Sequence, residues 1–547
     1  WFRHQARAAR HELDEQVRTP AGVRRLGRTA TGELDDTFSL FGGGRAIAEN
    51  LQLDRELPFA AEEESTVALV TIPGVETAAY DWTAEIEGLE PELDPLAEYI
   101  PADQHAAFFP SIEALVRTLD ELETEGNPIL SLAEGRAESA RSRERYQRQL
   151  CLPLDDGDSE LRRIPIGQIA VTGSDPYFRT GTDVAVLFQS PEPRTLVELV
   201  QRCMREAVED PQQRVRFEEG LMGDRLVPDG AVRSDDGSVR SILMVHGDVV
   251  LLTNSLVQAR RFSASGPDSA DSLARIPEYV WFRDRYPLGS EGEEGLLVLT
   301  DATIRRWAGP RWRIGASRRT QAAAWLADLQ CSKLAFDAGD PGATLPRGLP
   351  DGSPVEWGDD GARSAKWGTT AFLTPIAELD LEHVTPAEEA AYDRFRRRYQ
   401  AGWRAWFDPI AVQLVRRGNE LEADLTVRPL IAGSDYRGWM DTVGGSKLAA
   451  GAGDPHEGTL VHFAMALDTR AEPVQFASSL LAGSGPDPLQ DVLGWIGGGM
   501  GLYLEPDAEF FDGWRQALED DEEEIWVDEH ISEFPLALHV ESKSSVK

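Results

Sequence analysis

The pattern of short apolar runs between residues 164 and 301 constrains the fold most. Runs of strand length outnumber helical ones, and two of them flank His246-Gly247-Asp248, which is typical of a tight hairpin. A parallel sheet needs a long crossover between successive strands, usually a helix, and too few helices are present here. We therefore expect an α+β fold with mixed or antiparallel sheets flanked by helices. Strands are expected at residues 182–189, 214–219, 238–247, 248–254 and 295–300, and helices at 193–207, 255–262 and 277–286.

The regions before residue 164 and after residue 301 also contain both predicted strands and predicted helices. Helical spacing of apolar residues predicts helices at 110–123 and 385–407, and Thr385-Pro386-Ala387-Glu388 is a capping box. Asn254 is expected to cap the helix that follows it, and the glycine run at 497–501 to form a flexible turn. Further strands are expected at 66–73, 410–415, 421–429 and 459–467, and a further helix at 132–150.

A chain of 547 residues predicts several domains. Gly-Ser-Asp recurs at 173–175 and 433–435, which indicates either a duplicated module or the chance recurrence of a common turn. We expect a helical N-terminal arm at 1–60, an α+β and helical domain at 61–160, an α+β domain at 161–315, a helical connecting segment at 316–407, and an α+β domain at 408–547 that the sequence cuts short.

The charge balance excludes some partners. There are 94 acidic and 55 basic side chains, which gives a net charge of −39 that repels phosphate backbones, so no nucleic-acid partner is expected. Cys151, Cys203 and Cys331 have no metal-binding spacing. No phosphate-cradling loop, HExxH, GxSxG or dinucleotide motif occurs, and no cofactor is expected.

A basic belt at residues 304–319 is the first candidate site. It contains six arginines and two tryptophans, side chains that bind carboxylates or phosphates and stack on flat groups. The belt is interpreted either as a surface for an acidic protein partner or an anionic polymer, or as a set of internal pairs with the protein's own carboxylates. The candidate ligand-binding residues are Arg305, Arg306, Trp307, Arg311, Trp312, Arg313, Arg318 and Arg319.

A metal site is the second candidate. His456, Glu457 and His462 combine imidazole and carboxylate donors, and residues six apart lie on one side of a strand. The alternative is that His456 lies in a loop and His462 in a core.

The N-terminal arm carries seven arginines and three acids as far as Arg28, a local charge of +4. This pattern is typical of a stretch beside a membrane helix, so membrane association is expected only through a segment upstream of Trp1. The equal alternative is an amphipathic helix that docks on its own protein.

Several motifs resemble those of large envelope proteins of planctomycete-type bacteria with duplicated α+β domains of unknown function. The matching stretches are 146–153, 172–184, 252–258, 282–287, 300–307, 493–496 and 503–507. The resemblance implies an extracytoplasmic, membrane-anchored location and brings no catalytic residues. The expected function is a non-enzymatic interaction or scaffold protein of the cell envelope. The alternative is a hydrolase with dispersed catalytic residues that acts on a polymer, and the low cysteine count also fits the cytoplasm.

Overall fold

The computed structural model divides the chain into two compact units, residues 1–130 with 138–430, and residues 131–137 with 431–547. The described residues are 65–76, 81–126, 141–152, 154, 160–178, 180–210, 214–217, 229–267, 269, 271–339, 342–358, 361–403, 409–418, 420–428, 459, 461–466, 496–505, 507, 510–513 and 535–542. Within them, no helix combines the length and the apolar character needed to cross a bilayer.

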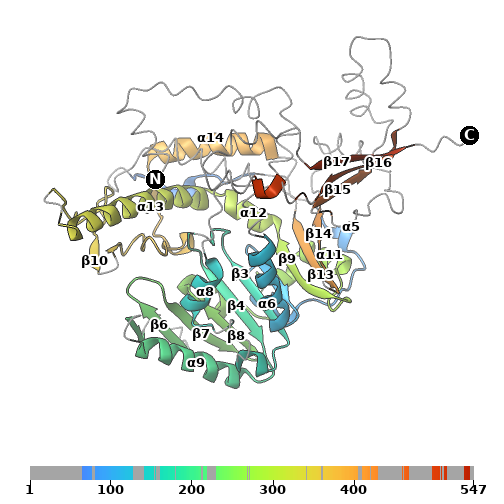
Figure 1. Cartoon of the computed structure of the whole chain (residues 1–547), viewed down its shortest axis with the longest axis horizontal. Coiled ribbons are helices and arrows are strands. Elements are labelled where there is room, and N and C mark those ends of the chain that lie inside the picture. Colours follow the sequence, from blue (N-terminus) through green and yellow to red (C-terminus); the bar gives the residue numbers. More distant parts are fainter. Residues whose placement is uncertain are drawn as a thin grey trace, which may run out of the picture. The chain divides into compact units, whose positions relative to one another are not determined.

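A ten-stranded antiparallel sheet organises the first unit (Figure 1). Its strands are β2 (His105–Phe109), β3 (Gln168–Gly173), β4 (Val184–Gln189), β5 (Val215–Phe217), β6 (Gly230–Ser234), β7 (Arg240–His246), β8 (Val249–Thr253), β9 (Glu293–Leu299), β13 (Ile410–Arg417) and β14 (Glu420–Val427). The spatial order is β14-β13-β9-β2-β3-β4-β8-β7-β6-β5. The α+β class is thus confirmed, with the antiparallel form of sheet. Strands from three of the expected segments, 61–160, 161–315 and 408–547, share this one sheet.

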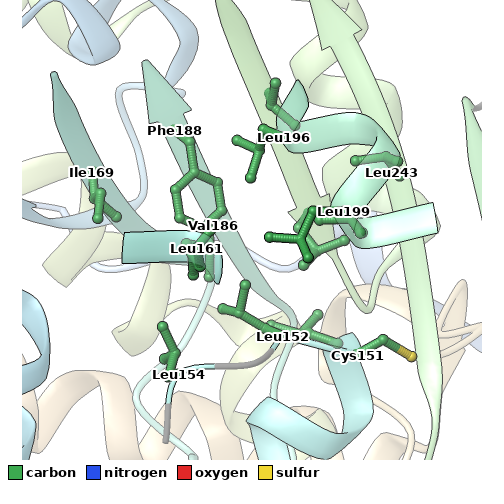
Figure 2. Packing of buried hydrophobic residues seen from close by; sticks show 14 of the residues in the cluster. Cys151, Leu152, Leu154, Leu161, Ile169, Val186, Phe188, Leu196, Leu199 and Leu243 are labelled. Atoms are coloured by element: carbon green, nitrogen blue, oxygen red, sulfur yellow. The ribbon is translucent and has the colours of Figure 1, made fainter. Parts of the chain in front are cut away.

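Helices cover both faces of the sheet. One face packs against α6 (Ile112–Glu121), α8 (Ser142–Leu150) and α9 (Pro193–Glu209), and the other against α10 (Leu256–Ala264) and α11 (Pro277–Arg285). Successive side chains of a strand point to opposite faces, so Val186 and Phe188 of β4 enter the first core (Figure 2). Leu187, which lies between them, enters the second core. Burial on both faces explains the continuous apolar runs of the central strands.

A second layer of helices follows β9 in the chain. It consists of α12 (Asp301–Ala308), α13 (Pro310–Asp337) and α14 (Pro386–Trp403). The capping box that begins α14 is confirmed, because Thr385 N–H donates to Glu388 Oε2 (2.8 Å) and Glu388 N–H donates to Thr385 Oγ1 (3.1 Å). Two short strands, β1 (Val67–Ala68) and β12 (His383–Val384), pair beside this layer.

Smaller elements complete the description. In the first unit these are β10 (Glu356–Gly358), β11 (Gly361–Arg363) and α5 (Thr83–Ile86), together with the short 3-10 and π turns η2 (Leu69–Thr71), η3 (Pro95–Tyr99), η4 (Leu122–Gly126), η5 (Glu160–Arg163), η7 (Leu273–Arg275) and η8 (Ile376–Glu378). The second unit has an antiparallel sheet of β15 (Val461–Ala466), β16 (Ile496–Leu504) and β17 (Leu536–Ser542). The second Gly-Ser-Asp turn lies outside the described residues, so the duplication stays a prediction.

Three local predictions were wrong. The glycine run at 497–501 lies inside β16, where Gly499 and Gly501 pair with β15 and Gly501 also pairs with β17. The expected strand at 66–73 ends at Ala68 and continues as the 3-10 turn η2. Ser255, and not Asn254, caps α10, because Asn254 is used to join β4 to β8: its Oδ1 accepts from Val184 N–H (2.9 Å) and its Nδ2 donates to Thr182 O (2.9 Å).

Candidate functional site

The basic belt lies on α12 and the first turns of α13. Three of its arginines form ion pairs with carboxylates of the same unit. The pairs are Arg305 with Asp301 (2.5 Å), Arg306 with Asp103 (2.9 Å) and Arg318 with Glu388 (2.6 Å). The last pair is bidentate and joins α13 to the start of α14. These contacts are the internal pairs that the sequence analysis gave as the alternative to a ligand site.

The other belt residues make different contacts. Arg319 is buried and donates to Gly181 O, while the Arg313 guanidinium lies 4.6 Å from the centre of the Phe395 ring. Trp307 donates to Ser174 O (2.8 Å), and the Trp312 ring is buried beneath the Arg306 guanidinium at 4.8 Å. These side chains hold the helical layer to the loop between β3 and β4.

Arg311 differs from the three paired arginines. Its guanidinium donates to Leu379 O (2.7 Å), and it pairs with no carboxylate in the part of the chain that the structure describes. Burial lowers the pKa of Arg311, and the charge of nearby Asp380 opposes that effect. A guanidinium in this state still has donors to offer to an added anion.

A groove of about 650 Å³ opens beside Arg311, and we call it the α13 groove. The 3-10 turn after β1 shapes one wall, because it buries Leu69 and leaves Val70 91% exposed. The lining combines the apolar Leu69, Val70, Ile72, Pro310, Trp312 and Leu381 with the charged or titratable Arg306, Arg311, Glu382 and His383. The groove therefore combines an apolar surface with two guanidinium groups, the Glu382 carboxylate and the His383 imidazole.

A buried polar cluster adjoins Arg306. It comprises Ser174, Asp175, Thr182 and Asp183 from the loop between β3 and β4, with Gln258 of α10. Asp183 Oδ2 accepts from Ser174 Oγ (2.6 Å) and from Gln258 Nε2 (2.7 Å). Thr182 Oγ1 lies 3.3 Å from both Asp175 O and Asp183 Oδ1, and Asp175 Oδ1 accepts from the Tyr177 N–H (2.9 Å). Asp175 Oδ2 has no hydrogen-bond partner among the residues that the structure describes.

The electrostatics of the buried polar cluster follow from its burial. Desolvation, followed by the neighbouring charge of Asp175, raises the pKa of Asp183 to about 7. Desolvation likewise raises the pKa of Asp175, although Arg319 opposes the change. His105 of β2 is buried nearby, and desolvation together with Arg306 lowers the pKa of its imidazole to about 4. The histidine is therefore neutral at pH 7, while Asp183 titrates there.

A hydrolase would need a serine, a base and an open path for substrate. Ser174 donates to Asp183, and neither ring nitrogen of His105 has a hydrogen-bond partner. Ser174 and Asp183 are completely buried and His105 nearly so. The three residue types converge without the nucleophile-to-base contact that acyl transfer uses. The hydrolase alternative stays a prediction.

The metal candidates are not brought together by any described contact. His456 and Glu457 lie outside the described residues, and His462 lies in β15 opposite Tyr503. Among the residues that the structure describes, no group of three or more His, Cys, Asp or Glu side chains could hold a metal ion. The metal site at 456–462 therefore stays a prediction.

The comparisons with known proteins leave this site without a precedent. No family model matches the chain, and no curated protein or solved structure matches it either. The likeness to envelope proteins therefore stays a prediction. Sequence reasoning missed the α13 groove and the buried polar cluster, although two aspartates at the ends of one short loop, Asp175 and Asp183, were a visible signal for the second.

Proposed function

We propose that this protein is an interaction protein whose α13 groove holds a short apolar segment of a protein partner, with one carboxylate of that segment placed at Arg311. The observation that carries the proposal is the groove itself, an accessible apolar surface with an arginine at its edge that has no carboxylate partner in the described residues. The scaffold role expected from the sequence is the same class of function.

Apolar contact supplies the affinity in this proposal. Val70 is 91% exposed at the groove, which is unusual for a valine beside a buried tryptophan, Trp312. Covering such surface contributes about 25 cal/mol per Å² of apolar area removed from water. The preferred occupant is thus a segment with one or two large apolar side chains.

Charge decides between the two partners that the sequence left open. Arg311 offers a guanidinium that has no carboxylate partner in the described residues, whereas Arg306 already pairs with Asp103 and Glu382 also lines the groove. The chain as a whole carries a net charge of −39. A long anionic polymer would extend into that negative field and be repelled, whereas a short segment with one acid would not. A peptide segment is therefore favoured over a polymer.

A displayed library of random dodecapeptides, selected on the immobilised full chain, tests the proposal. We expect the enriched peptides to share large apolar residues and one Asp or Glu. Arg311→Gln and Val70→Asp are each expected to weaken peptide binding about tenfold. The first removes the cation that pairs with the peptide carboxylate, and the second removes apolar contact surface. Arg397→Gln is the matched control, since Arg397 is an exposed arginine of α14 outside the groove.

Two results would contradict the proposal. One is unchanged binding in both groove variants, which would place the peptide elsewhere. The other is competition by polyglutamate that exceeds competition by the selected peptides, which would favour the anionic polymer. A location in the cell envelope belongs to the same proposal and rests on the resemblance alone, and fractionation of native cells tests it.

A further inference from the structure

We propose that the α13 groove is under proton control, such that protonation of the buried Asp175 and Asp183 pair strengthens the binding of an anion beside Arg306. The inference rests on the proposed function, since it assigns a regulation to the same groove. It is argued from the placement of the two carboxylates and their connection to α12.

The two carboxylates form one buried unit. Both side chains are completely buried, and Thr182 Oγ1 lies 3.3 Å from the backbone oxygen of Asp175 and 3.3 Å from Asp183 Oδ1. Neither carboxylate forms an ion pair within the described part of the chain, and one oxygen of Asp175 has no partner. Desolvation and the charge of Asp175 both disfavour the ionised form of Asp183, so the pair readily keeps a proton.

Arg306 connects this pair to the groove. Its guanidinium lines the groove and lies over Trp312, and its main carboxylate partner is Asp103. Asp183 and Asp175 act on the same guanidinium at longer range. The next residue on α12, Trp307, donates to the backbone oxygen of Ser174, so the pair and the groove wall are also joined by a hydrogen bond.

The other groups that face the pair do not titrate between pH 5.5 and 8.5. Arg319 of α13 stays charged, and burial raises the pKa of Tyr146 of α8 far above this range. His105 of β2 stays neutral because its pKa is about 4. Gln258 of α10 is uncharged. In the groove itself the side chain of His383 is exposed, so it needs a control variant of its own.

The sign of the effect follows from charge. At pH 8.5 the negative charges of the ionised pair offset part of the positive charge of Arg306. At pH 5.5 a bound proton removes one of these negative charges. An anion in the groove is then attracted more strongly. The effective dielectric constant between the pair and the groove lies between that of a protein surface and that of water. Neutralising one carboxylate of the pair then lowers the dissociation constant of the anion by about fivefold.

The probe is 8-anilinonaphthalene-1-sulfonate, an apolar ring system whose sulfonate stays ionised over the whole range. Its fluorescence is titrated with the full chain at pH 5.5 to 8.5. We expect the wild type to bind about fivefold more tightly at pH 5.5. Asp183→Asn is expected to bind tightly at both pH values, while His383→Gln is expected to keep the pH dependence.

A second variant guards against misfolding of the first. Asp175→Asn removes the repulsion within the pair, so the midpoint of the pH dependence is expected to move to lower pH. Asn at position 183 can still accept from Ser174 and Gln258 through its carbonyl oxygen. A pH dependence that survives in Asp183→Asn, or that disappears in His383→Gln, would overturn the inference.

A second readout separates this inference from the proposed function. The indole N–H signal of ¹⁵N-labelled Trp307, assigned with Trp307→Phe, is expected to shift with a midpoint near pH 7 in the wild type and to stay constant in Asp183→Asn. A constant wild-type signal overturns proton control even if the probe binds. A shifting signal with no binding of the probe overturns both proposals, because the pair titrates but there is no binding to control.

Discussion

Two buried carboxylate sites in the first unit differ in how their charge is compensated. Asp94 receives both a bidentate pair from Arg283 (2.5 and 2.6 Å) and donors from Gln168 and Tyr279. Asp175 and Asp183 are equally buried but receive hydroxyl, amide and backbone donors only.

The difference shows that burial alone does not set the protonation of a carboxylate. In the first site Asp94 raises the pKa of Arg283, so its guanidinium stays charged and pairs with both Asp94 and Glu293. In the second site burial and mutual repulsion raise the pKa values of both acids. A carboxylate that is ion-paired to an arginine therefore stabilises the fold. The Asp175 and Asp183 pair, which has no such ion pair in the described residues, responds to pH.

The largest expected effect breaks the first site. Arg283→Met leaves Asp94 buried without its cation, and the free energy of unfolding is expected to fall by about 3–5 kcal/mol. Urea unfolding at pH 7 measures it. The double variant Arg283→Met with Asp94→Asn is the control and should recover part of the loss, because the uncompensated charge is then removed. A loss below about 1 kcal/mol in the single variant would contradict the comparison.

The second prediction concerns how the free energy of unfolding depends on pH because of Asp183. The folded-state pKa of Asp183 is about 7 and its unfolded value near 4, so wild-type stability is lost as the pH rises through 7. Between pH 5.5 and 7 the loss is about 2 kcal/mol, at about 1.4 kcal/mol per pH unit. The difference in unfolding free energy between wild type and Asp183→Asn should show this slope. Two parallel pH profiles would refute the titration of Asp183.

The smallest effect concerns a pair at intermediate burial. Arg318 forms a bidentate pair with Glu388, which also caps α14. Arg318→Gln is expected to lower the unfolding free energy by about 1 kcal/mol, because the pair is partly solvated and the capping box remains. Arg397→Gln, at an exposed pair on the same helix α14, should change it by less than about 0.5 kcal/mol. Thermal unfolding of both variants measures the two losses. Equal losses in the two variants would contradict the role given to burial.

Much of the sheet was predictable because its strands carry local signals. The hairpin of β7 and β8 and that of β13 and β14 follow the expected apolar pattern. The long helix α13 was predicted only as part of a helical connecting segment at 316–407, without bounds of its own. It buries different sides along its length: Ile314 packs into a core with α14, while Leu326 and Leu329 pack into another. A helix of this kind shows no single apolar stripe.

The candidate site was less predictable than the sheet for a related reason. The belt arginines were visible in the sequence, but whether each one meets a carboxylate depends on residues far along the chain, as Arg318 and Glu388 show. Gln258 and Asp183 are likewise 75 positions apart. No local pattern encodes such pairings, so the groove and the contacts within the buried polar cluster could be found only from the fold.

The order of strands also has a consequence for how the chain acquires its structure during synthesis. β2 pairs with β3, but its other neighbour is β9, which lies nearly two hundred residues further on. The hairpins of β3 with β4 and of β7 with β8 can form as soon as they leave the ribosome, whereas β2 keeps an open edge until residue 299 is made. At roughly 5–20 residues per second, that edge stays exposed for about ten seconds or longer. Chaperones that cover unpaired strands would have their main task in this interval.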